Sequence, residues 1–180
     1  MRAVVVYESM FGNTHAVAEA IGEGLRGACD VTVVPVGQAG PDVLHDAGLV
    51  VVGGPTHVHG MTRRRSRAAA AEAARRPGST VALEEGAEGP GVREWLASLD
   101  YVNVLALAFD TRMKGPALFT GRASKKIGLE LERHGAYLLA PPESFFVSRD
   151  NSLEAGEEAR ARRWGEQVAA VIPAAQRGPA

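Results

Sequence analysis

Cysteine, long apolar runs and charge of one sign are all scarce in this sequence. Its one cysteine, Cys29, cannot form a disulfide within the chain. No apolar run approaches the about 20 residues that a membrane-spanning helix needs, and the N-terminal stretch meets Glu8 too early for a signal peptide. The net charge of −1 commits no surface to nucleic acid or another polyanion. We therefore expect a cytoplasmic protein with no membrane span and no nucleic-acid partner.

The residues that are present fit a globular chain. It has 180 residues, of which 46% are hydrophobic and 23% are charged. Short apolar runs rich in β-branched residues predict five strands, at Arg2–Tyr7, Val31–Val36, Gly48–Gly53, Val102–Phe109 and within Ala136–Val147. Apolar residues three and four positions apart predict helices, at Asn13–Gly27, Arg64–Arg76, Val92–Leu99, Ser124–His134 and Asn151–Ile172. Strands that are apolar throughout are covered on both faces, so the pattern predicts an α/β protein, a three-layer α/β/α sandwich around a five-stranded parallel sheet.

We expect a single domain over residues 1–173. Residues 77–90 carry Gly, Pro and a cluster of Glu, which predicts a surface loop, and residues 174–180 are expected to be a frayed tail. Pro141 and Pro142 interrupt the fifth strand, which is typical of a sheet edge or a bend. Asn151 or Ser152 is the expected cap of the last helix.

The segment Glu8–Thr14 joins the first strand to the first helix and is the first candidate site. Ser9, Asn13 and Thr14 supply neutral donors, and Gly12 lets the backbone approach a ligand closely. The N–H groups at the start of the helix add the positive end of its dipole, so the segment favours an anion. It has no Lys or Arg, which suits a terminal monophosphate better than a triphosphate. The alternative is an ordinary helix cap formed by Asn13 or Thr14.

The stretch from residue 5 to residue 21, VVYESMFGNTHAVAEAI, resembles the flavodoxin signature. The matching residues are Val5, Val6, Tyr7, Ser9, Gly12, Thr14, Ala18 and Ile21. The resemblance implies a flavodoxin-like sheet with strand order 2-1-3-4-5 and a bound FMN. It also implies that the FMN phosphate is wrapped by Ser9, Met10, Phe11, Gly12, Asn13 and Thr14.

The segment from residue 53 to residue 63 is, by the same resemblance, the loop that covers one side of the isoalloxazine ring. Its expected cofactor-binding residues are Pro55, Thr56, His57, Val58, His59 and Gly60. A peptide here, His59–Gly60 or Gly60–Met61, is expected to flip and bond the flavin N5 on reduction, because glycine makes both backbone states accessible. Flavodoxins usually place an aromatic residue here, whereas this chain has His57 and His59. The two histidines with His15 or Asp110 also allow a metal site, which we consider the lesser alternative because no cluster of carboxylates or cysteines lies near them in the sequence.

The segment from residue 108 to residue 115 should face the pyrimidine side of the flavin. The expected contacts are Phe109, Asp110, Thr111 and Arg112. We hypothesise that the Arg112 guanidinium raises the reduction potential of the flavin, since a positive charge stabilises the anionic reduced ring. The alternatives are a core position for Phe109 and a surface pair between Asp110 and Arg112.

The leading interpretation is an FMN-binding electron carrier that works between redox partner proteins, a reductase and an acceptor. The alternatives are an FMN-dependent quinone or porphyrinogen oxidoreductase, and a binding or regulatory module of the same fold that has lost flavin. The arginine-rich run Arg63–Arg67 is interpreted as a solvated helix face. A docking patch for an acidic partner and a contact for the phosphate of a nicotinamide cofactor are the alternatives. Flavodoxins are typically acidic and this chain is nearly neutral, so we expect its electrostatic docking to be weaker and less dependent on salt than in a typical flavodoxin.

Overall fold

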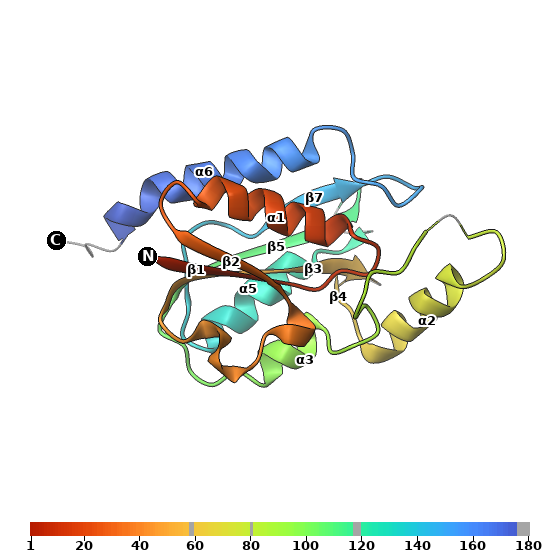
Figure 1. Ribbon diagram of the computed structural model, residues 1–180, viewed down its shortest axis with the longest axis horizontal. Helices are drawn as coiled ribbons and strands as arrows, with labels where there is room; N and C mark the ends of the chain where they lie inside the picture. Colours follow the sequence, from red (N-terminus) through yellow and green to blue (C-terminus); the bar gives the residue numbers. More distant parts are fainter. Residues whose placement is uncertain (58–59, 80, 117–119, 176–180) are drawn as a thin grey trace.

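A parallel sheet forms the centre of the protein in the computed structural model, which describes residues 1–57, 60–79, 81–116 and 120–175 (Figure 1). Its strands are β1 (Arg2–Tyr7), β2 (Asp30–Pro35), β3 (Ala47–His57), β5 (Leu105–Met113), β6 (Tyr137–Leu138) and β7 (Glu143–Val147). The order is β2-β1-β3-β5-β6, and β7 also pairs with β5. All of these pairs are parallel. The predicted order 2-1-3-4-5 is confirmed, with β5 as the fourth strand and β6 and β7 as the two parts of the fifth.

Helices cover both faces of the sheet. One face carries α1 (Asn13–Leu25) and α6 (Glu157–Ala175), and the other carries α3 (Val92–Ala97) and α5 (Ala123–Arg133). The helix α2 (Arg64–Ala74) extends away from this sandwich in Figure 1. Two short 3-10 helices, η1 (Val36–Gln38) and η2 (Pro41–Leu44), follow β2. Residues 77–79 and 81–90 form turns and irregular backbone. None of the helices described is both apolar enough and long enough to cross a membrane.

Two strands run further than predicted, toward the edge where the candidate site lies. β3 continues to His57 and β5 continues to Met113, because the parallel ladder between them persists through Gly53↔Phe109 to Pro55↔Thr111. A short strand that was not predicted, β4 (Gly60–Met61), then pairs antiparallel with the end of β3. Much of the two predicted loops is therefore strand.

The last two elements also differ from prediction. The fifth strand is divided by the segment containing Pro141 and Pro142, since proline cannot donate to the ladder. The last helix begins at Glu157, and neither Asn151 nor Ser152 caps it. Asn151 has φ 63°, which is left-handed and incompatible with an α-helix, and a turn closed by the Ser148 N–H donating to the Ser152 carbonyl (2.8 Å) occupies the segment instead. The helix continues past Ile172 to Ala175.

Glycines bring α1 and α6 together. A Cβ on Gly24 would collide with the backbone carbonyl oxygen of Arg162, and a Cβ on Gly165 would lie 2.5 Å from the carbonyl oxygen of Ile21. The two backbones therefore touch directly. Below them, Val5, Val51, Phe109 and other apolar side chains fill the core on this face of the sheet.

Candidate functional site

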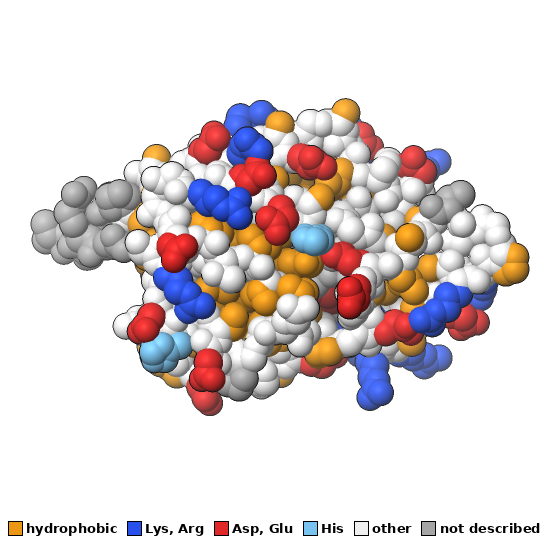
Figure 2. All heavy atoms as spheres, in the orientation of Figure 1, with side chains coloured by type: hydrophobic (Ala, Val, Ile, Leu, Met, Phe, Trp, Pro, Cys, Tyr) orange, Lys and Arg blue, Asp and Glu red, His pale blue; other side chains and the backbone are white. Residues whose placement is uncertain are grey.

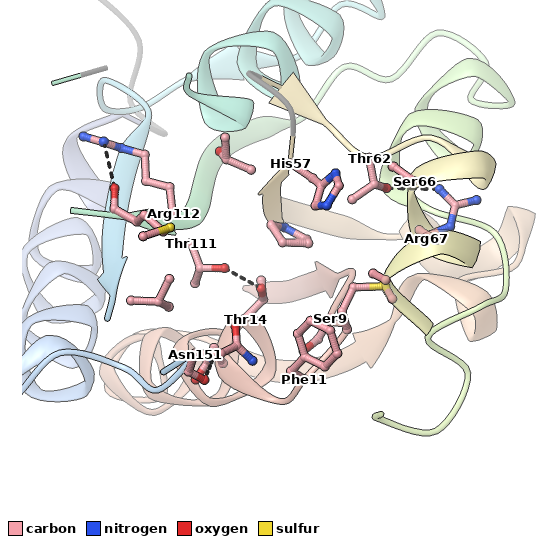
Figure 3. A pocket seen from close by; sticks show the side chains of 17 residues that line it. Ser9, Phe11, Thr14, His57, Thr62, Ser66, Arg67, Thr111, Arg112 and Asn151 are labelled. Atoms are coloured by element: carbon pink, nitrogen blue, oxygen red, sulfur yellow. Dashed lines mark hydrogen bonds between the residues drawn. The ribbon is translucent and has the colours of Figure 1, made fainter. Parts of the chain in front are cut away.

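A cleft of about 230 Å³ opens where β1, β3 and β5 end. β1 leads into α1 on one face of the sheet, whereas the chain after β3 returns to the other face, so the cleft lies at the point where ligands bind in open α/β sheets. Its walls come from five segments: the residues after β1, the end of β3, the end of β5, the end of β7 with the loop that follows, and the start of α2 with Thr62 before it (Figure 3). The expected residues that line it are Ser9, Met10, Phe11, Asn13, Thr14, Pro55, Thr56, His57, Thr111 and Arg112.

The segment after β1 forms an open turn. Gly12 adopts φ 87°, and its N–H donates to Ser9 Oγ (3.1 Å). α1 begins at the next residue without a side-chain cap, which argues against the simple helix-cap alternative. Within the described parts of the chain, no acceptor is found for the N–H groups of Asn13, Thr14 and His15. The turn therefore presents free N–H groups and neutral hydroxyl groups to the cleft.

Two contacts join this turn to other walls of the cleft. Thr14 Oγ1 and Thr111 Oγ1 share a hydrogen bond of 2.7 Å, which links α1 to β5. Asn13 Nδ2 donates to the carbonyl oxygen of Asn151 (2.8 Å) in the loop after β7. Figure 3 shows Thr14, Thr111 and Asn151 converging at the same end of the cleft. The contribution of Asn151 could not be predicted, because its loop had been assigned to a helix.

The second wall is the end of β3. Pro55, Thr56 and His57 line the cleft, and the Thr56 hydroxyl accepts a hydrogen bond from the Ala123 N–H at the start of α5 (2.8 Å). Gly60 is buried in β4 opposite His57 and does not line the cleft. Val58 and His59 lie outside the described residues, as does one end of the His59–Gly60 peptide.

A metal site finds no support among the side chains that can be placed. No group of three His, Cys, Asp or Glu in the described ranges is arranged to hold an ion. His15 stacks on Tyr7 with ring centroids 4.6 Å apart, and its Nδ1 lies 2.6 Å from Glu84 Oε1. Asp110, the other candidate third ligand, binds a helix terminus instead.

The third wall is the end of β5, and two of the expected cofactor contacts there do not line the cleft. Phe109 is fully buried in the core, where its ring meets Gly53 and packs edge to face with Phe145 at 6.2 Å. Asp110 is also fully buried, and its Oδ2 accepts a hydrogen bond from the Ser124 N–H in the first turn of α5 (2.7 Å). Both side chains lie outside the cleft because β5 stays in the sheet past the point where it was predicted to end.

Arg112 lines the cleft with its side chain mostly buried. Its Nη1 donates to the carbonyl oxygen of Gly115 (2.8 Å) and to Thr120 Oγ1 (2.7 Å), and its guanidinium stacks on the Phe146 ring at 4.9 Å. Burial lowers the pKa of this guanidinium, an effect that the nearby Asp110 carboxylate opposes. No ion pair within 4.0 Å joins the two residues, so the expected surface pair is wrong.

A buried polar network that the sequence did not reveal lies behind the opposite end of the cleft. Thr62 donates to the Glu8 carboxylate, Glu8 Oε2 accepts from the Val92 N–H (2.8 Å), and Arg67 Nη1 donates to Thr62 Oγ1 (3.0 Å). Arg67 is only 2% exposed and also pairs with Glu94 at 3.0 Å. Burial raises the pKa of Glu8, although its hydrogen bonds and Arg67 oppose the shift.

Arg67 shows that one residue of the arginine-rich run is not on a solvated face. It and Ala71 are the two buried residues of α2, four positions apart, and this spacing was the signal that could have identified it. The lining residues that were not predicted are Thr62, Ser66, Arg67, Ala70, Met113, Val147 and Asn151.

The topology and the cleft define a doubly wound α/β protein with a cleft at the carboxyl edge of its sheet. Comparison of the sequence with protein-family models and with curated proteins finds no match. Solved structures do match. A flavodoxin from the domain Archaea has 22% identity and a TM-score of 0.64, over 96% of this chain and 99% of the other. The oxidised flavodoxin 1 from Bacillus cereus has 14% identity and a TM-score of 0.64, over 96% and 99%. A flavodiiron core from Synechocystis has 15% identity and a TM-score of 0.63, over 97% of this chain and 36% of the other. The chain has the flavodoxin-like fold.

Proposed function

We propose that the cleft binds FMN and that the protein carries electrons between partner proteins. The observation that carries the proposal is the turn after β1, where the N–H groups of Asn13, Thr14 and His15 have no acceptor among the described residues. These donors surround the start of α1 without a charged side chain, which suits a phosphate monoester. The likeness to flavodoxin structures over 96% of this chain supports this choice.

The residues present fit the whole cofactor as well as its phosphate. Ser9 and Thr14 would hold the phosphate, together with the backbone of Gly12. The flat ring would lie against Pro55 and His57 on one side and against Thr111 on the other. When bound, FMN supplies the one-electron and two-electron chemistry, and the side chains bind it, orient it and exclude water. The expected peptide flip near Gly60 remains part of this proposal.

The function of electron carrier rests on the same site. An exposed rim around a bound flavin is sufficient for transfer to another protein, and no side chain of the cleft need act as an acid or base. We propose a cytoplasmic carrier that works between a reductase and an acceptor. An oxidoreductase with its own quinone or porphyrinogen substrate, and a module that binds no flavin, are the alternatives.

Titration of the purified protein with FMN and with riboflavin tests this proposal. We expect saturable quenching of FMN fluorescence, and binding of riboflavin at least about tenfold weaker, because riboflavin lacks the group that the free N–H groups hold. Thr14→Val should weaken FMN binding several-fold and leave riboflavin binding unchanged. The control, Thr32→Val, changes an exposed threonine of β2 and should alter neither.

Failure to bind FMN at millimolar concentration would refute both redox functions and leave a module without flavin. Equal affinity for riboflavin and FMN would refute the assignment of the phosphate turn. For an FMN-loaded protein, rapid NAD(P)H oxidation in the presence of a quinone would identify an enzyme, whereas a carrier should be nearly inert without a reductase.

A further inference from the structure

Basic side chains gather at the mouth of the cleft although the whole chain is nearly neutral. On one side, Arg63, Arg64 and Arg65 precede the cleft-lining residues of α2. On the other side, Lys114 follows Met113 at the end of β5, and Arg149 lies in the loop after β7. All five of these side chains are exposed.

The three arginines of α2 are not neutralised by neighbouring acids. Within the described ranges, no ion pair is formed by the side chains of Arg63, Arg64 or Arg65. In Figure 2, basic side chains stand out from the region that α2 forms in Figure 1. By contrast, Arg67 on the same helix is buried and paired with Glu94. The three exposed arginines therefore form no ion pair with the described residues that would stabilise the fold, and their charges face solvent.

Acidic side chains near the mouth do not cancel this charge. Asp150 is the exposed acid of the loop after β7. In the loop that follows α2, Glu88 is paired with Arg75, and Glu84 lies 2.6 Å from His15 Nδ1, which cancels the charge of Glu84 only when the imidazole is protonated. Glu85 lies in a separate cavity beside β2. The rim that surrounds the cleft is therefore positively charged.

An apolar side chain lies within this basic rim. Met113 lines the cleft and is 49% exposed. An apolar centre within a charged surround is typical of surfaces where proteins meet, because burial of the centre contributes binding energy while the charges direct the approach. We propose that the mouth of the cleft, formed by Arg63, Arg64, Arg65, Met113, Lys114 and Arg149, is a docking surface for an acidic redox protein.

This inference rests on the proposed function for its electron-transfer step and adds the kind of partner. It also changes the expectation of weaker docking. A partner at the mouth lies within about 10 Å of the local charges, and salt largely screens the charges elsewhere on the molecule from it.

A plant-type [2Fe–2S] ferredoxin, which is acidic, is a suitable probe. Each reduced ferredoxin gives up one electron and is oxidised, so two of them reduce one bound FMN fully, with protons taken from water. In stopped-flow measurements on the FMN-loaded protein, we expect the second-order rate constant to fall at least about tenfold between roughly 10 and 200 mM salt. Cytochrome c, which is basic, should show the opposite salt dependence when it oxidises the reduced protein.

The decisive variant is Arg64→Glu/Arg65→Glu, whose acidic residues in the first turn of α2 also suit the helix dipole and so preserve the fold. It should react with ferredoxin at least about tenfold more slowly at low salt and bind FMN normally. The matched control is Arg26→Glu/Arg133→Glu, which makes the same change in net charge at the opposite ends of α1 and α5. It should alter the rate less than about threefold.

Equal slowing by both double variants, no slowing by the first, or a rate that ignores salt would overturn the proposal. Tight binding of duplex DNA that only the first double variant abolishes would assign the arginines to nucleic acid and would also overturn it. Calorimetry can measure the binding of oxidised ferredoxin to the FMN-free protein and to the FMN-free forms of the same two double variants. This measurement tests the docking surface separately from the proposal of FMN binding. If FMN does not bind, the proposed function fails and calorimetry still decides the docking surface.

Discussion

The two helices that border the cleft are held in opposite ways. α1 lies against α6 through backbone contacts at Gly24 and Gly165, with one exposed ion pair, Glu23 with Arg162, beside them. α2 is held by Arg67, which reaches Thr62, Glu94 and the carbonyl oxygen of Gly89. The helix that follows the turn at Gly12 is thus positioned mainly by shape, and the helix that carries the basic rim is positioned by charge and hydrogen bonds. Close packing of uncharged groups does not respond to pH, whereas contacts that involve titratable side chains do.

The largest effect is expected from Gly24→Ala, which tests whether shape holds α1. The new Cβ would meet the backbone of Arg162 and Glu166, neither of which can rotate away. We expect a loss of about 2 kcal/mol in the free energy of unfolding, although alanine favours a helix over glycine by about 1 kcal/mol. Thermal and urea unfolding measure this loss.

Gly27→Ala is the matched control, because nothing lies within 4 Å of a Cβ at Gly27. It should leave stability unchanged or slightly increased. An unaltered melting temperature in Gly24→Ala would show that the two helices can separate at little cost, and the contrast between α1 and α2 would disappear.

Glu8→Gln tests whether titratable groups hold α2. Burial raises the pKa of Glu8 above its ordinary 4.5, with Thr62 and Val92 opposing the shift. The folded state therefore holds this proton more tightly than the unfolded state does, and the stabilisation that results is complete below pH 4.5 and is lost as the pH rises through the raised pKa. The glutamine variant should lack this decline, which melting curves from pH 4 upward can measure.

The exposed Glu132 of α5 provides the control, since Glu132→Gln should keep the pH dependence of the original chain. Identical pH profiles for Glu8→Gln and the original chain would contradict the role assigned to Glu8.

The smallest effect is expected from Arg112→Ala, which concerns the charge in the wall of the cleft. Loss of the positive charge should lower the two-electron midpoint potential of bound FMN by about 30 mV, equivalent to about 1.4 kcal/mol. Arg112→Lys, which keeps a charge while losing the contacts with Gly115 and Thr120, should restore most of the potential. Spectroelectrochemical titration provides the values, and a potential within error of the original would refute the hypothesis.

The sequence predicted the architecture because the central strands contain short apolar runs and the major helices have apolar stripes. It also predicted Ser9, Asn13 and Thr14 as lining residues, since the residues that form this turn lie close together in the sequence. It did not predict where β3 and β5 end, because the ladder between them depends on pairing rather than on either segment alone. For that reason Phe109 and Asp110 were assigned to the cleft.

Contacts between distant segments were equally out of reach. Asn151 meets Asn13 across 138 positions of the chain, and Arg67 meets Glu8 only through Thr62. An arginine within an arginine-rich run is expected to be exposed, so only the four-residue spacing of Arg67 and Ala71 hinted at its burial.

The division of the fifth strand has a consequence for how the molecule meets its neighbours. A sheet edge exposes unpaired N–H and C=O groups that another chain can extend into an aggregate. Here that edge consists of a two-residue strand, a proline pair and a five-residue strand. No long uninterrupted edge remains as a template for intermolecular pairing, so Pro141 and Pro142 protect this side of the sheet from aggregation.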